Sequence, residues 1–336
     1  MHWMRMTDVR PMWVLSLVPN VRFGRLLCAA LVLALMLGAY TAAGLFTQRS
    51  TGGTPPNVAV FFAVILAYIV PTYHYIVARC TDALTDLERR VDVSPEERGA
   101  LRRSIAERST VSQLSIVGVG LTAGVLHNVA LTYPEGLVRS FFASPAEAAV
   151  ICGTLLVWIV MTTVVTGLFQ IATVFARLAT RVRVDLLQPR ALTPFARVAV
   201  ILTLGIVGAQ AAFPLLWLDN TLSLTASAPG FIGTAIPMVF LFLMPLLPIH
   251  RRIAAAKAAE IARLDVEVAA LTCSHGESDG RGFDDVVPLA ALLAYRREID
   301  AVHEWPFNMG VASRLAIYLV IPPLTWIATA LIQHFV

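Results

Sequence analysis

The chain has few charged residues, and long stretches of it have none. Only 14% of its 336 residues are Asp, Glu, Lys or Arg, against about 25% in soluble domains. Seven segments of roughly 20 residues or more, each long enough to cross a hydrocarbon core of about 30 Å as a helix, contain none of the four types: 26–46, 57–78, 113–133, 148–176, 198–218, 230–249 and 315–335. This composition excludes a soluble globular domain. It predicts an all-α polytopic membrane protein with seven transmembrane helices.

No predicted span carries a carboxylate or an arginine in its apolar centre. Coupled carriers and pumps usually hold ionisable groups at membrane depth, so this absence argues against a coupled transporter. His74 and His127 lie in different spans and at different depths, which disfavours a shared metal or haem. We expect His127 and the adjacent Asn128 to hydrogen-bond to neighbouring helices instead.

Motifs for catalysis and metal binding are also missing. The four cysteines form no CxxC motif, so we expect neither disulfides nor a thiolate metal site. HExxH, GxSxG and P-loop patterns are absent, and DGRGFDD lacks the acid spacing of an EF-hand. We therefore predict no catalytic site, no cofactor and no metal. A membrane enzyme would have to use the unorganised group His250, His275, His303 and Glu304.

Arginine is distributed very unevenly between the two sets of loops. Of the 26 Lys and Arg residues, only Arg49 and Arg139 lie in one set, and the others lie in 1–25, 79–112, 177–197 and 250–314. Basic loops stay in the cytoplasm. The pattern predicts a multi-pass protein of the cell (inner) membrane with a cytoplasmic N-terminus and an outside C-terminus. Because topology explains the net charge of +4, no nucleic-acid partner is needed.

The domain organisation follows from the same loops. We predict a cytoplasmic N-terminal segment, 1–25, and one seven-helix membrane domain, 26–336. Cytoplasmic helical parts of that domain are expected at 79–112, 177–197 and 250–309.

The first and third of these helical parts carry local signals. In the first, Ser94, Pro95 and Glu97 have the spacing of an N-cap, a first-turn proline and a capping-box acid. In the third, two apolar stripes at helical spacing predict an antiparallel pair of helices that serves as a cytoplasmic anchor. One stripe is Ile253, Ile261, Leu264, Val268 and Leu271, and the other is Leu292, Tyr295, Ile299 and Val302.

The last span, LAIYLVIPPLTWIATALIQHFV (315–336), carries polar groups on one face. An arc of about 100° holds Arg314, Tyr318, Pro322, Thr325, Thr329 and Gln333. Pro322 also frees the carbonyl of Tyr318, one turn earlier. Such carbonyls are tolerated at membrane depth when they face water or are buried in protein. These six residues are the candidate pore lining, and a dry polar seam between helices is the alternative.

A secondary polar stripe lies on the fourth span. An arc of about 80° holds Thr162, Thr166, Gln170, Thr173 and Arg177. This face fits hydrogen bonds between helices as well as a water path. Close helix packing is predicted where small residues recur, at Gly120 and Gly124 and at Gly205, Gly208 and Ala212.

Three pieces resemble patterns of uncharacterised bacterial polytopic membrane proteins. They are VDLLQPRALTPFARVAV (184–200), LPIHRRIAAAKAAEIARLD (247–265) and YRREIDAVHEWPF (295–307). The predicted topology is also similar to that of the insect odorant and gustatory receptor superfamily of ion channels. In that superfamily the last helix divides into a cytoplasmic anchor part and a pore-lining part. The resemblance implies that 288–305 is the anchor part and 310–335 the pore part, but it implies no ligand and no ion selectivity.

The function expected from these patterns is that of an ion channel in the lipid bilayer, lined by the last span. We expect this channel to be a homo-oligomer, such as a tetramer. One alternative is a membrane-embedded scaffold or sensor that binds a cytoplasmic protein partner. Another is an uncoupled small-molecule transporter.

The arginine distribution generates a topological prediction. A C-terminal reporter enzyme that works only outside the cytoplasm should be active when fused after Val336. A fusion active only in the cytoplasm would contradict the seven-span topology. The same reporter fused after Arg89 serves as the control, because that connection is predicted to be cytoplasmic.

Overall fold

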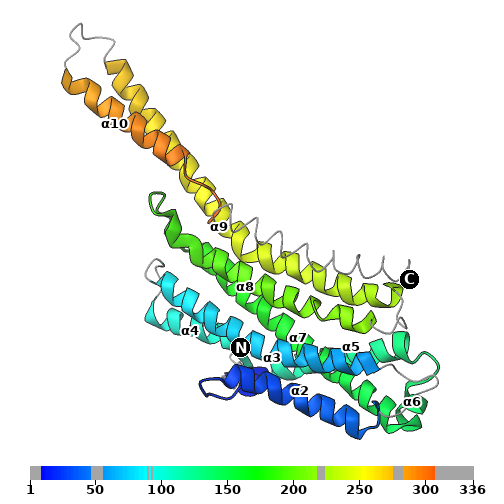
Figure 1. Cartoon of the computed structure of the whole chain (residues 1–336). Coiled ribbons are helices and arrows are strands. Elements are labelled where there is room, and N and C mark those ends of the chain that lie inside the picture. Colours follow the sequence, from blue (N-terminus) through cyan, green and yellow to red (C-terminus); the bar gives the residue numbers. More distant parts are fainter. Residues whose placement is uncertain are drawn as a thin grey trace, which may run out of the picture.

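The computed structural model describes residues 9–46, 56–88, 91, 94–217, 224–274 and 283–306. In this part, six helices are long and apolar enough to cross a membrane (Figure 1). They are α2 (Gly24–Ala42), α3 (Pro56–Leu87), α5 (Thr110–His127), α7 (Pro145–Ala179), α8 (Thr193–Gln210) and α9 (Leu224–Ser274). The all-α class is confirmed, and these helices coincide with the first six predicted spans. The seventh segment, 315–335, lies outside the described residues, so the seven-span count and the orientation stay predictions.

Shorter elements connect these helices. They are β1 (Val9–Pro11), α1 (Trp13–Ser16), α4 (Pro95–Ala106), β2 (Glu107–Ser109), the π-helical turn η2 (Asn128–Thr132), α6 (Leu137–Ala143), the 3-10 turns η3 (Pro189–Leu192) and η4 (Phe213–Trp217), and α10 (Phe283–Asp300). The strands β1 and β2 pair in antiparallel orientation, with Arg10 opposite Arg108. Met12, Val14 and Val18, which follow β1, are buried in the core of the helical bundle.

Helix α7 lies at the centre of the bundle. It packs against α5 and α9 and also contacts α2, α3 and α4. Its residues Leu168, Ile171 and Phe175 are almost fully buried. A helix enclosed by neighbours needs apolar side chains on more than one face. This position fits the segment 148–176, which contains no Asp, Glu, Lys or Arg along its whole length.

Glycines allow two helix pairs to approach closely. A Cβ atom added to Gly120 of α5 would lie 2.8 Å from the Cα atom of Ile159 in α7, and one added to Gly124 would lie 3.2 Å from the Cα atom of Leu155. The GxxxG prediction is therefore confirmed, because any side chain would separate these backbones. On α8, Gly208 instead makes room for the side chain of Tyr68 from α3.

The predicted capping signals after α3 are confirmed, but the segment is not helical throughout. Ser94 and Glu97 form the reciprocal capping box at the start of α4. Arg102 of α4 makes two hydrogen bonds to the carboxylate of Glu88, at 2.6 and 2.7 Å. After α4 the chain forms β2 rather than helix, since its backbone pairs with β1. Within 177–197 the chain is also not helical between 180 and 188.

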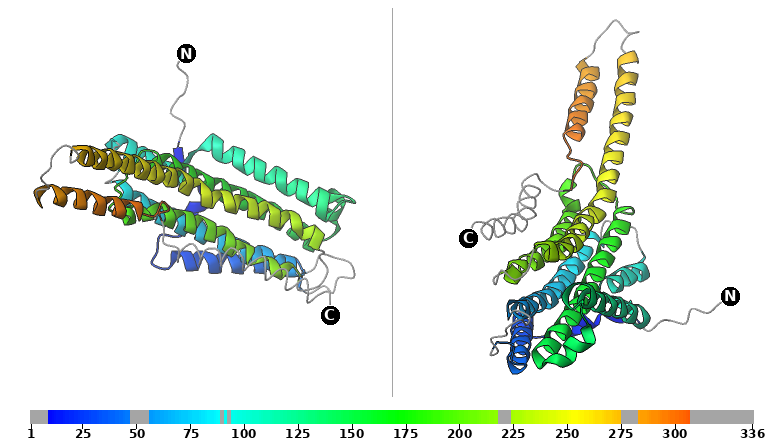
Figure 2. Two further views of the ribbon diagram at one scale, coloured as in Figure 1. Left: turned by 90° about the horizontal axis from the view of Figure 1, so that it is seen from above. Right: turned by 90° about the vertical axis from the view of Figure 1, so that its right-hand side faces the viewer.

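Helix α9 continues well past the bundle as one uninterrupted helix. Its 51 residues correspond to a length of about 75 Å. Figures 1 and 2 show α10 running back beside its outer half. We call 250–274 together with 283–305 the arm. Leu264 and Ile299 are fully buried in it, and Arg296 of α10 bonds to Asp265 of α9 at 2.6 Å. The two predicted stripes therefore form an antiparallel helix pair.

Two buried asparagines in the spans differ in their hydrogen bonds. Asn57 of α3 donates from Nδ2 to the carbonyl of Leu216, at 2.7 Å. Asn128, at the end of α5, is fully buried, and neither its Oδ1 nor its Nδ2 has a partner. The expectation that Asn128 bonds to a neighbouring helix is wrong. The adjacent His127 packs its ring against that of Trp158, with 5.8 Å between centroids.

This difference predicts opposite effects for one substitution. Asn128→Leu should raise the free energy of unfolding by about 1 kcal/mol, because it removes a buried amide without a partner. Asn57→Leu should lower it by about 1–3 kcal/mol, because it leaves the carbonyl of Leu216 unpaired. Thermal melting of both variants in one detergent measures the two effects. If Asn128→Leu destabilises as much as Asn57→Leu, the Asn128 amide has a partner after all.

Candidate functional site

The residues of the secondary polar stripe on α7 differ in their surroundings and in their hydrogen-bond partners. The Thr166 hydroxyl donates to the carbonyl of Thr162 at 2.6 Å, and the Thr173 hydroxyl donates to that of Phe169 at 2.8 Å. Each hydroxyl therefore donates its hydrogen bond within its own helix. Arg177, at the end of α7, is exposed.

Gln170 joins the stripe to the α4–β2 connection. Its Oε1 accepts a hydrogen bond from Nε of Arg108, and its Nε2 donates to the carbonyls of Ser104 and Glu107. Arg108 also donates from Nη2 to the carbonyl of Thr166, at 2.7 Å. We call Arg108, Thr166 and Gln170 the polar node. It ties a connecting segment to the central helix of the bundle.

The pattern of the spans does not indicate Arg108, because Arg108 lies in the connection between α4 and α5. Burial lowers the pKa of Arg108, but an arginine starts so basic that the side chain stays charged at neutral pH. A shallow hollow of about 490 Å³ adjoins the polar node, and Arg103, Ser104 and Ser112 also line it. This hollow opens at the surface beside β2. These contacts have a structural role, because they hold α4 and β2 against α7.

A second group of polar contacts lies where the arm leaves the bundle. The ring of His250 on α9 stacks on that of Trp305, with centroids 4.2 Å apart and planes at 10°. Nδ1 of His250 lies 3.2 Å from the carbonyl oxygen of Glu304 and donates to it. Trp305 follows α10, so these contacts return the chain to the base of the arm.

Cations on α9 complete this junction. Lys257 donates from Nζ to the carbonyls of Asp300 and Val302, at 2.6 and 3.2 Å. A cation at the last carbonyls of a helix stabilises its C-terminus. Arg252 donates to the carbonyl of Val182, in the connection between α7 and α8, at 3.1 Å. We call His250, Arg252, Lys257, Glu304 and Trp305 the junction.

The contacts of the junction position α10 and the residues that follow it against α9. Its histidine is held by a backbone carbonyl and an aromatic ring, and its lysine by backbone carbonyls. In the part of the chain that the structure describes, no group of three or more His, Cys, Asp or Glu side chains could hold a metal ion. The sequence hint for the junction is HEW (303–305), directly after a helix and before an apolar run.

The candidate pore-lining residues follow the junction in the chain. Arg314, Tyr318, Pro322, Thr325, Thr329 and Gln333 all lie outside the described residues. Pro306 is the last described residue. The pore-lining role of that face stays a prediction.

In the part of the chain that the structure describes, six apolar helices and a projecting arm indicate the class of an all-α, membrane-embedded protein. No protein-family model, curated protein or solved structure matches it. The resemblances to bacterial polytopic membrane proteins and to the insect receptor superfamily therefore stay predictions.

Proposed function

We propose that the chain is one subunit of a homo-oligomeric membrane channel. In this proposal the arms hold the subunits together and the last apolar segment, 315–335, lines the path. The observation that carries it is the junction, which returns the chain to the base of the arm shortly before that segment.

The outer face of the arm supports assembly. Opposite the buried Leu264, α9 exposes small apolar residues at alternating spacings of four and three: Ala255, Ala259, Ala262, Val266 and Ala269. This is the spacing of a coiled-coil seam, in which small side chains permit a close approach of helices. Val266 is 70% exposed, a large value for an apolar side chain at the centre of a stripe. A second copy of the same helix would cover it.

The packing of the bundle supports a path between subunits. Tyr73, Leu168 and Phe175 fill the centre of the described bundle and are almost fully buried. A path for ions would then use surfaces outside this core, and the uncharged last segment with its polar face is the suitable element.

The polar node favours a second candidate, a membrane-embedded scaffold without a path. The threonines of the α7 stripe bond to their own helix, and Gln170 bonds to Arg108 and to backbone carbonyls. One of the two polar stripes therefore serves packing. If the stripe on the last segment does the same, the arm is left as the functional element, with a cytoplasmic protein as its partner.

The assembly part is tested on the outer face of α9. Val266→Glu should reduce the mass of the detergent-purified oligomer to that of a monomer, because the seam would bury unpaired carboxylates. Ala291→Glu, on an exposed position of α10 away from the seam, should leave the mass unchanged. Light scattering coupled to gel filtration measures both. An oligomer that survives Val266→Glu excludes assembly through this face.

The channel part is tested on the last segment. With the native cysteines replaced, single cysteines at Thr325 and Thr329 should react with a water-soluble thiol reagent and lose most of the ionic current in planar bilayers. Cysteines at Leu319 and Ile327, off the polar face, should stay unreacted, because the reactive thiolate forms only where water reaches sulfur. Protection at all four positions in an intact oligomer would favour the scaffold.

A further inference from the structure

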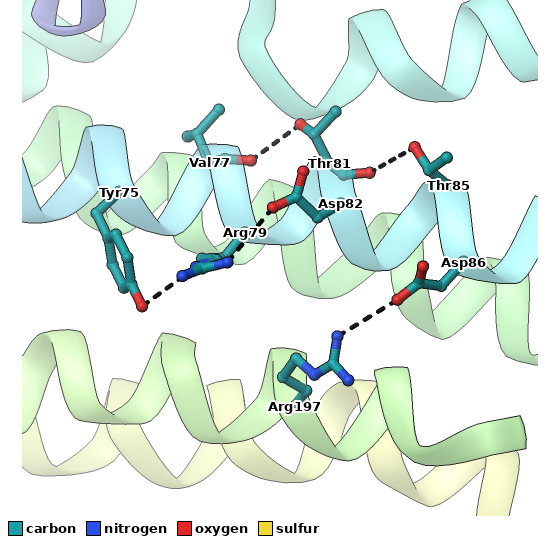
Figure 3. Close-up of polar contacts among 8 residues, drawn as sticks. All are labelled: Tyr75, Val77, Arg79, Thr81, Asp82, Thr85, Asp86 and Arg197. Carbon is teal, nitrogen blue, oxygen red and sulfur yellow. Dashed lines mark hydrogen bonds and ion pairs between the residues drawn. The ribbon is translucent and has the colours of Figure 1, made fainter. Parts of the chain in front are cut away.

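Two arginines from different helices meet at one tyrosine ring. The guanidinium carbon of Arg25, at the start of α2, lies 5.2 Å from the ring centre of Tyr75 in α3. That of Arg79, one turn further along α3, lies 5.3 Å from the same centre. Arg79 also donates from Nε to the Tyr75 hydroxyl at 3.3 Å, as Figure 3 shows. Like charges are therefore gathered around one aromatic side chain.

The carboxylates nearby do not balance this charge. Asp82 lies 3.7 Å from Nη1 of Arg79, and both side chains are more than half exposed. Asp86, the next acid along this face, is paired at 3.3 Å with Arg197 of α8 (Figure 3). Arg25 has only a neutral acceptor, since its Nε donates to Nδ1 of His74 at 3.2 Å. None of the ion pairs among the described residues includes Arg25.

The position of the arginines identifies the kind of anion. Arg25 comes directly before the apolar run of α2, and Arg79 directly after the apolar part of α3, so both mark one boundary of the membrane. Beyond Arg25, α2 exposes four leucines along its length: Leu26, Leu27, Leu31 and Leu35. A ligand that meets both features has an anionic head and apolar chains.

We propose that Arg25 and Arg79 bind the phosphate group of an anionic phospholipid. The guanidinium groups of two helices would hold the headgroup from two sides, with hydrogen bonds of the kind arginine makes to phosphate oxygens. The acyl chains lie along the exposed leucines of α2. The lipid then completes the charge balance at this boundary and fixes α2 against α3.

Native mass spectrometry of the full chain in detergent tests the site. Phosphatidylglycerol should bind in preference to phosphatidylcholine. The Arg25→Gln/Arg79→Gln double variant should lose that preference, by roughly fivefold in affinity for each arginine removed. If the double variant does not fold, Arg25→Gln alone should lose about fivefold, because it leaves Arg79, Tyr75 and Asp82 in place.

Arg197→Gln is the matched control. Arg197 is an exposed arginine at the same face but is already paired with Asp86, so its variant should keep the preference for phosphatidylglycerol. An equal loss in this control would show that only general surface charge acts, and would overturn the proposal. So would an unchanged preference in the variants of Arg25 and Arg79. Competition by millimolar glycerol phosphate would instead identify a site for a free anion.

Discussion

Lipid offers no hydrogen-bond partner, and the rest of the structure depends on this constraint. Each apolar segment that the structure describes satisfies its backbone hydrogen bonds as a helix. Hydroxyl groups inside the spans follow the same rule, because those of Thr41, Thr163 and Thr203 donate to the carbonyl four residues earlier. The hydroxyl groups of these three threonines therefore already have an acceptor within their own helix. Threonine spacing alone cannot distinguish a water path from a packed seam between helices. On α7 the hydrogen bonds of Gln170 to Arg108 and to backbone carbonyls favour the packed seam.

A second constraint is the limited room for side chains between α7 and its neighbouring helices. Gly153 and Gly167 lack side chains where the hydroxyls of Tyr40 and Tyr73 lie, since an added Cβ atom would be 2.1 and 2.2 Å from those oxygens. Glycine on the central helix thus creates room for large side chains from α2 and α3. Glycine on α5, by contrast, brings two backbones together. One residue type serves both kinds of packing because the partner helix supplies either a long side chain or its own backbone.

The sequence predicts features that depend on local pattern, and it misses those that depend on distant contacts. Six spans, the capping box at Ser94 and the helix pair of the arm all follow from composition or periodicity over about 20 residues. The pairing of β1 with β2 joins segments about 100 residues apart, and no alternation of polar and apolar residues announces it. The sequence predicts Gln170 as a polar position. It does not predict its partner, because Arg108 is positioned by the pairing of β2 with β1. The exposed stripe of α9 escapes notice because alanine is an ordinary helix residue.

Contacts at one level of the structure join the arm to the bundle. Helix α9 passes from the bundle into the arm as one continuous helix. After α10 the chain returns to α9, where the ring of Trp305 stacks on that of His250. At nearly the same position of α9, Arg252 donates a hydrogen bond to the connection between α7 and α8. The chain therefore enters and leaves the arm at one fixed place. This place is therefore where the described part of the arm is fixed to the bundle.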